Sequence, residues 1–294
     1  MGSRIVKASA LSLLMVVSPA LMAKTVTAVA SFSVLADMVK EVGGEHVTVT
    51  SLVGRNGDPH AFSPSPKDSL ALNKADVVFV SGLGLEGWMD RLVAASGYKG
   101  AVVIASNGIQ TRSMEEEGHK VTDPHAWNSA KNGAVYARNV MNALIAADPQ
   151  DKNYFQQRGA AYIQRLEKLD AWAKETFAAV PESKRKVLTS HDAFGYFAAE
   201  YGVHFLSPVG FSTEAEASAS DVGKLIQQIK QEKIAAYFIE NQTDPRLVKQ
   251  IAAASGAQPG GELYPEALSE ENGPAPSYAA AFKHNVETIA ASMK

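Results

Sequence analysis

The sequence contains no cysteine among its 294 residues. That absence excludes a disulfide scaffold, a thiol nucleophile, an iron–sulfur cluster, a cysteine-type zinc finger and a lipid attached to a lipoprotein-type cysteine. Long runs of like charge are also lacking, and 28 basic against 31 acidic side chains give a net charge of -3. This balance argues against a nucleic-acid-binding protein. Any metal site must therefore be built from His, Asp, Glu or backbone oxygen.

The chain has little that resembles a membrane span. The apolar run Ala8–Val17 near the N-terminus is too short to cross a bilayer as a helix. It follows two basic residues and leads through small residues to Ala23, which is the pattern of a secretory signal peptide. We expect residues 1–23 to be removed by cleavage before Lys24, and the mature protein to be soluble, not lipidated and exported to a periplasm.

Strand-type and helix-type patterns alternate over residues 24–150 and again over 181–294. Short β-prone runs such as Val77–Val80 alternate with segments such as 34–42, in which apolar residues recur every three or four positions. Alternation of this kind predicts parallel sheets connected by right-handed helical crossovers. We therefore predict an α/β fold of two lobes, each built on a parallel sheet.

Residues 151–180 interrupt this alternation. From Asp151 to Ala179 there is no proline, and only Gly159 weakens a stripe of aromatic and aliphatic residues with helical spacing. One helix of this length measures about 40 Å at 1.5 Å per residue, enough to extend from one lobe to the other. We predict a rigid linker helix, ended by Pro181, that permits local loop rearrangement rather than wide hinge closure.

Histidine is scarce, with seven residues, and two of them occupy the same tetrapeptide: Asp58-Pro59-His60-Ala61 and Asp123-Pro124-His125-Ala126. Loops of this kind lie at the carboxyl ends of parallel strands, where ligands bind. Proline restricts the backbone ahead of each imidazole, and each aspartate could accept a ring N–H and fix the tautomer. The alternative is chance recurrence of a turn motif, which the second copy at a matched position disfavours.

His191 follows the strand-type run 186–190 and takes the corresponding place in the second lobe. A fourth ligand is expected from the same lobe, and the residue pattern leaves four carboxylates open: Glu240, Asp244, Glu262 and Glu266. Three imidazoles and one carboxylate suit Zn²⁺, whereas Mn²⁺ prefers more oxygen. A site assembled this way bridges the cleft between the lobes.

Five segments together resemble a known family. They are GDPHAFSPSP (57–66), TDPHAW (122–127), HDAFGYF (191–197), EAEAS (214–218) and LYPEAL (263–268). With them, residues 24–294 resemble the cluster 9, or cluster A-I, zinc and manganese solute-binding proteins of ABC importers. The resemblance implies two α/β lobes joined by a rigid backbone helix. It also implies a periplasmic receptor, not an enzyme, whose partners are an ABC permease and its ATPase.

The resemblance further implies the ligand set. His60 and His125 match the two ligands of the first lobe, and His191 matches the third, which is His in zinc-type members and Glu in many manganese-type members. Glu266 matches the fourth position, where Asp is usual, so its longer side chain is a departure. The resemblance therefore implies a zinc-type protein, with manganese or iron as alternative ions and Glu262 or water as an alternative fourth ligand.

The acidic segment 113–120 is a second departure, because many zinc-specific members carry a longer His-rich loop there. We expect a solvated loop, and as an alternative a weak metal-collecting loop. One rival function is a zinc hydrolase with three histidines and a water, although the sequence reveals no general base. The other is a surface adhesin, although the sequence shows no repeat. We expect a monomer, and a metallochaperone is a further candidate partner.

Overall fold

The computed structural model describes residues 25–116, 119–210, 212–214, 217–234 and 236–294. The predicted signal peptide, residues 1–23, lies outside the described residues. Among the residues that are described, none of the helices has both the length and the apolar character that a membrane span requires.

The first lobe is built on a four-stranded parallel sheet with the strand order β2-β1-β3-β4. Its strands are β1 (Val26–Phe32), β2 (Val47–Val53), β3 (Val77–Val80) and β4 (Ala101–Ile104). The helices of its crossovers are α1 (Ser33–Gly43), α2 (Pro66–Asn73) and α3 (Met89–Ser96). All residues of β3 are buried, because helices cover both faces of a parallel sheet and a continuous apolar run fits such a strand.

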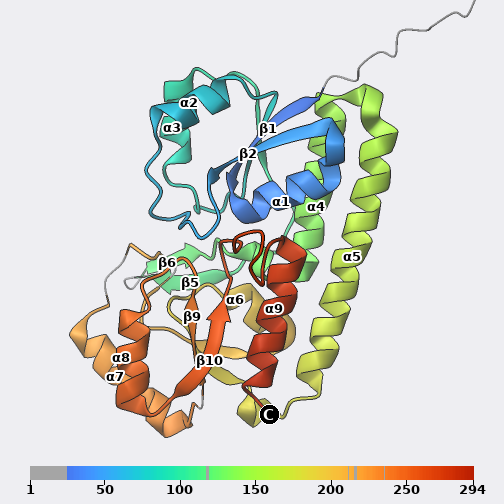
Figure 1. Ribbon diagram of the computed structural model, residues 1–294. Coiled ribbons are helices and arrows are strands. Elements are labelled where there is room, and N and C mark those ends of the chain that lie inside the picture. The colour runs from blue at the N-terminus through green and yellow to red at the C-terminus, as the bar shows by residue number, and fades with distance from the viewer. Residues whose placement is uncertain (1–24, 117–118, 211, 215–216, 235) are drawn as a thin grey trace, which may run out of the picture.

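The second lobe repeats this plan with the strand order β10-β9-β7-β8, again parallel. Its strands are β7 (Lys186–Leu188), β8 (His204–Leu206), β9 (Ala236–Glu240) and β10 (Gln258–Leu263). Its helices are α6 (Gly195–Tyr201), α7 (Ala219–Glu232), α8 (Arg246–Ser255) and α9 (Tyr278–Ala291). Figure 1 shows the first lobe above the second, with the ends of their strands meeting at the boundary between them.

Two long helices pack against each other, α4 (Ala130–Ala147) and α5 (Lys152–Ala178), and the chain passes into the second lobe through α5. Figure 1 shows α5 alongside both lobes. Its buried Phe155 belongs to the core of the first lobe and its buried Phe177 to a core of the second. Gly159, the predicted weak point, lies where α4 approaches α5, and a Cβ there would stand 2.5 Å from the sulfur of Met141. The predicted fold class, two parallel-sheet α/β lobes joined by one long helix, is confirmed.

The segment 113–120 differs from the predicted solvated loop. It forms most of an antiparallel hairpin of β5 (Ser113–Glu116) and β6 (His119–Thr122), while residues 117–118 lie outside the described part of the chain. Met114 pairs with Val121 in this hairpin. The strands are mostly polar and exposed, so the segment is solvated as predicted but forms strands instead of an irregular loop.

The linker helix predicted over residues 151–180 is slightly shorter, because α5 covers Lys152–Ala178. Helix α7 is capped by Ser218, whose hydroxyl accepts the backbone N–H of Asp221. Four short 3-10 turns complete the described elements: η1 (Gly44–His46), η2 (Ala126–Asn128), η3 (Pro149–Asp151) and η4 (Glu182–Lys184).

Candidate metal centre

His60 lies in the loop that follows β2, and neighbours on both sides hold that loop. Asp58 Oδ1 accepts the backbone N–H of His60 at 2.8 Å, and Asp58 Oδ2 accepts the hydroxyl of Thr213 at 2.6 Å. The indole N–H of Trp88 donates to the carbonyl oxygen of Pro59 at 2.9 Å. Asp58 therefore fixes the backbone of His60, where a hydrogen bond to the ring had been predicted.

His125 is held through its ring. Asp123 Oδ1 accepts both the backbone N–H of His125 and its ring Nδ1–H, each at 3.0 Å, as predicted for this copy of the motif. This bond leaves the lone pair of Nε2 free to bind a cation. The start of α6 presses against the same carboxylate, because a Cβ at Gly195 would lie 2.3 Å from Asp123 Oδ2.

His191 lies just after β7, and Glu240 at the end of the adjacent strand β9 orients it. Glu240 Oε1 accepts the backbone N–H groups of Ser190 and His191 at 3.0 and 3.2 Å, and Glu240 Oε2 contacts His191 Nδ1. Neighbouring parallel strands end at the same edge of the sheet, which places this carboxylate beside the imidazole. Glu240 is thus the partner of a candidate ligand and not itself one of the converging group.

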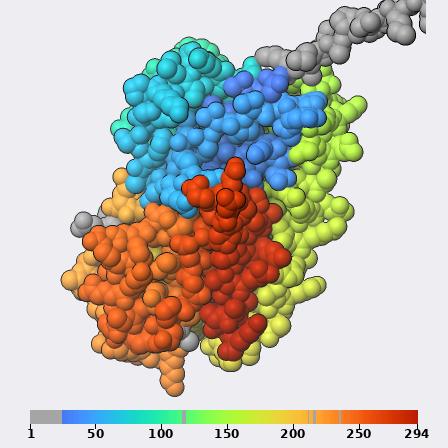
Figure 2. All heavy atoms as spheres, in the orientation of Figure 1, coloured from blue at the N-terminus to red at the C-terminus, as the bar shows by residue number. Residues whose placement is uncertain are grey.

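Glu266 follows β10 but is fixed against the first lobe. The backbone N–H of Asn56 donates to Leu268 O at 3.0 Å, and the backbone N–H of Leu268 donates to the hydroxyl of Ser33 at 3.1 Å. The indole N–H of Trp127 donates to the carbonyl oxygen of Pro265 at 2.7 Å. Figure 2 shows the segment before α9 lying against the first lobe. These contacts bring a carboxylate from the second half of the chain to the histidines of the first.

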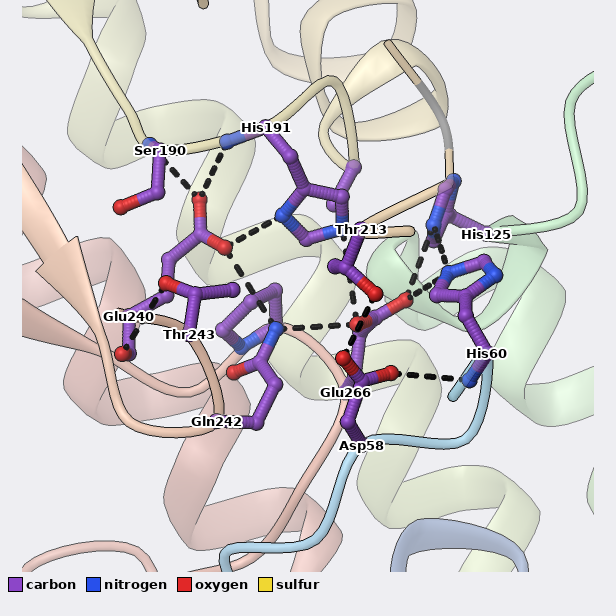
Figure 3. Close-up of polar contacts among 12 residues, drawn as sticks. Asp58, His60, His125, Ser190, His191, Thr213, Glu240, Gln242, Thr243 and Glu266 are labelled. Carbon is purple, nitrogen blue, oxygen red and sulfur yellow. Dashed lines mark hydrogen bonds and ion pairs between the residues drawn. The ribbon is translucent and has the colours of Figure 1, made fainter. Parts of the chain in front are cut away.

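The four side chains converge at one buried point between the lobes. Ligand atoms of His60, His125, His191 and Glu266 all lie within 4.8 Å of one another. Figure 3 shows the three imidazoles gathered around the carboxylate of Glu266. His60 is 9% exposed and the other three are at most 1% exposed. Among the described residues this is the one cluster of three or more such side chains suited to a metal ion.

The distances within the cluster suit a small cation. The Nε2 atoms of His60 and His125 are 3.3 Å apart, about the spacing of two nitrogens bound tetrahedrally to zinc at about 2.0–2.1 Å. Glu266 Oε1 lies 2.8 Å from His60 Nε2 and 2.9 Å from His125 Nε2. In the described part of the chain, the buried Nε2 of His191 has no hydrogen-bond partner and lies 3.4 Å from Glu266 Oε2.

The other carboxylates left open by the sequence lie elsewhere. Glu262 accepts the hydroxyl of Tyr264 at 2.6 Å, and Asp244 is exposed and pairs with Arg246. Neither belongs to the converging group.

Electrostatics at the site favour a bound cation or protons in its place. Burial lowers the pKa of His125, but hydrogen bonds to Asp123 and Glu266 outweigh it and raise this pKa from 6.5 to about 9. Burial likewise opposes the charged form of His191, yet the negative charges of Glu240 and Glu266 hold its pKa well above 6.5. Burial raises the pKa of Glu266, but the surrounding imidazoles hold it well below 4.5. The site thus keeps one ionised carboxylate among imidazoles.

A cavity of about 190 Å³ reaches the cluster from the side of His191, and Asp58, Thr213 and Gln242 are among the residues that line it. A larger cavity of about 590 Å³ lies beside Asp37, and none of the four converging side chains lines it. The smaller cavity therefore gives the approach to the site.

Sequence reasoning missed two residues that touch this site, Thr213 and Gln242. Gln242 Nε2 donates to Glu266 Oε2 at 2.9 Å. It lies two residues past the end of β9, and that position at the carboxyl end of a strand is the signal that could have identified it. Thr213 lies in an irregular loop, for which the sequence offers no comparable signal.

Comparisons with known proteins agree with this architecture. The family described as ZnuA, zinc-uptake complex component A, periplasmic, matches residues 28–292. The iron ABC transporter substrate-binding lipoprotein MtsA of Streptococcus pyogenes is 34% identical over 89% of this chain and 86% of its own. The manganese ABC transporter substrate-binding lipoprotein PsaA of Streptococcus pneumoniae is 32% identical over 88% of this chain and 86% of its own.

A solved structure gives the same result. The periplasmic zinc-binding protein TroA of Treponema pallidum superposes with a TM-score of 0.86 at 31% identity, covering 92% of this chain and 99% of its own. These three relatives are named for iron, manganese and zinc, and each is named as a binding protein rather than an enzyme. With nearly its whole length matched, this chain belongs to the ZnuA family.

Proposed function

We propose that this protein captures one divalent transition-metal ion between its lobes and delivers it to an ABC permease with its ATPase. His60, His125, His191 and Glu266 are the proposed ligands. The observation that carries the proposal is their convergence, buried, within 4.8 Å of one another. Such a site is expected to bind the ion and release it unchanged, because the ion is cargo and not a catalyst.

Zinc is the ion that we propose. Three imidazole nitrogens and one carboxylate oxygen make a four-ligand set typical of Zn²⁺, whereas Mn²⁺ sites contain more oxygen. The relatives are named for iron, manganese and zinc, so the support for zinc comes from the donor set of this chain. Manganese and iron are the alternative ions.

We propose that the protein acts in the periplasm as a monomer. All four proposed ligands belong to one chain, so no second copy is needed to complete the site. The relatives MtsA and PsaA are named lipoproteins, whereas this sequence has no cysteine to carry such a lipid. The proposal also includes export by a signal peptide over residues 1–23. It divides the rest of the chain into lobes at 24–150 and 181–294 and a linker at 151–180.

A zinc hydrolase is the less favoured alternative. A catalytic zinc usually has three protein ligands and an open position for water. Glu266 Oε1 already lies within 3 Å of the Nε2 atoms of His60 and His125, which is where the water of such an enzyme would bind. The arrangement therefore favours a closed binding site.

The test is competitive titration of the protein with Zn²⁺ and Mn²⁺ against chelators of known affinity. We expect one tight site that prefers zinc. The His191→Ala variant should weaken binding by more than the 10- to 100-fold typical of losing an outer-shell partner. The control is His204→Ala, since His204 is exposed on the edge strand β8, and it should bind as the wild type does. Absence of a tight site in the wild type would refute the proposal.

A further inference from the structure

Gln242 lies between the two buried carboxylates of the site. Its Nε2 donates to Glu266 Oε2 at 2.9 Å and is 3.4 Å from Glu240 Oε2. Figure 3 shows the amide of Gln242 reaching both carboxylates. In the described part of the chain, its Oε1 has no hydrogen-bond partner. The reverse orientation of the amide would set that oxygen against two carboxylates. The amide therefore separates two negative groups by giving each an N–H.

The two oxygens of Glu266 consequently have different surroundings. Oε1 faces the Nε2 atoms of His60 and His125 at 2.8 and 2.9 Å. Oε2 faces the amide of Gln242 at 2.9 Å and lies farther, at 3.4 Å, from His191 Nε2. The hydrogen bond to Oε2 fixes the orientation of the carboxylate plane, so that Oε1 is the oxygen that points toward the imidazoles.

Holding this side chain matters because glutamate has three side-chain dihedral angles to restrict. A long flexible side chain loses conformational freedom when it is ordered. A hydrogen bond that already orders Glu266 therefore reduces the conformational entropy that is lost when the ion binds. Outer-shell partners of metal-binding carboxylates orient them in this way.

We propose that Gln242 is a positioning residue that makes Glu266 bind through one oxygen and thereby favours Zn²⁺ over Mn²⁺. This inference rests on the proposed function. One carboxylate oxygen and three imidazole nitrogens give the four ligands that Zn²⁺ adopts. A carboxylate free to rotate could offer both oxygens, and the added oxygen suits ions that take a larger, oxygen-rich shell.

The Gln242→Met variant tests this inference, because methionine is unbranched and of similar length but has no N–H donor. The matched control is Gln258→Met, since the Gln258 amide is exposed and donates to Gly256 O. Affinities for Zn²⁺ and Mn²⁺ are measured by chelator competition on each protein. We expect Gln242→Met to lose about 10- to 100-fold in zinc affinity and to lose less in manganese affinity, so that the zinc-to-manganese preference falls. The control should keep both affinities.

A purely structural role would lower both affinities by the same factor and leave their ratio unchanged, and that result would overturn the inference while leaving the proposed function intact. Unchanged affinities would do the same. If Gln242→Met fails to fold, Gln242→Asn supplies the test, since its amide is too short to reach both carboxylates, and the same fall in ratio is expected. A wild type without any tight site would overturn this inference and the proposed function together.

Discussion

Metal binding by this protein should release protons at neutral pH. The pKa of His125 is raised from 6.5 to about 9, and that of His191 is also held well above 6.5. The ring of His125 is therefore charged at pH 7 when no metal is bound, and the raised pKa of His191 shifts that ring in the same direction. An imidazole coordinates a metal only in its neutral form, so an arriving ion must displace at least one proton, and two if both rings titrate.

The size of the effect follows from the pKa of His125. A rise from 6.5 to about 9 corresponds to about 3 kcal/mol in favour of the charged ring. The ion must overcome this preference at neutral pH but not above the raised pKa. The apparent affinity should therefore increase about tenfold per pH unit for each proton released and level off above pH 9.

Isothermal titration calorimetry in buffers of different ionisation enthalpy counts these protons directly. At pH 7 the observed enthalpy should vary with the ionisation enthalpy of the buffer, with a slope between about one and two protons. Chelator competition at several pH values should show the matching rise in affinity. An enthalpy that is independent of the buffer, together with a flat affinity between pH 6.5 and 8.5, would refute the reasoning.

Three further predictions concern single groups. The pKa of His125 rises from 6.5 to about 9 on folding, so the charged ring contributes about 3 kcal/mol to the free energy of unfolding below pH 6.5. This contribution is lost as the pH rises toward 9, and urea unfolding of the metal-free protein should show the loss. Glu240→Leu removes the partner of His191 and should lower zinc affinity about 10- to 100-fold. The control Glu262→Gln should leave zinc affinity unchanged, and equal effects of the two variants would contradict the role given to Glu240. Burial raises the pKa of half-buried Asp37 from 3.8 to about 6, so the ionised carboxylate destabilises the folded protein at pH 7.5. Asp37→Asn should therefore stabilise the protein at that pH by about 1–2 kcal/mol, after allowance for the partial exposure of the side chain. An unchanged melting temperature would count against this prediction.

Much of the fold was predictable because its signals are local. The buried run of β3 and the proline-free stretch of α5 (Lys152–Ala178) carry their periodicity in the residues themselves. The hairpin of β5 and β6 was missed because most of its residues are polar and exposed, so burial imposes no strong alternation on them. Helix caps such as Ser218 depend on a choice among neighbouring hydroxyl and carboxylate side chains that the sequence alone does not rank.

The candidate site was predictable to a similar extent. The repeated tetrapeptide marked His60 and His125, whose shared loop pattern is visible in the sequence. Pattern alone did not select Glu266 from the other carboxylates, because its position depends on contacts between distant segments, such as Asn56 with Leu268. Gln242 was missed for a similar reason, since its amide acquires a role only when Glu266, from the segment after β10, lies beside it.

The central claim is that three histidines and one glutamate hold the ion. X-ray absorption at the zinc edge of the one-to-one complex tests it most directly, with Glu266→Ala as the comparison. The account predicts three imidazole nitrogens and one oxygen at about 2.0–2.2 Å in the wild type, and loss of the carboxylate oxygen together with weaker binding in the variant. A first shell with fewer than three imidazoles would contradict the claim. So would a Glu266→Ala variant whose first shell and zinc affinity both match those of the wild type.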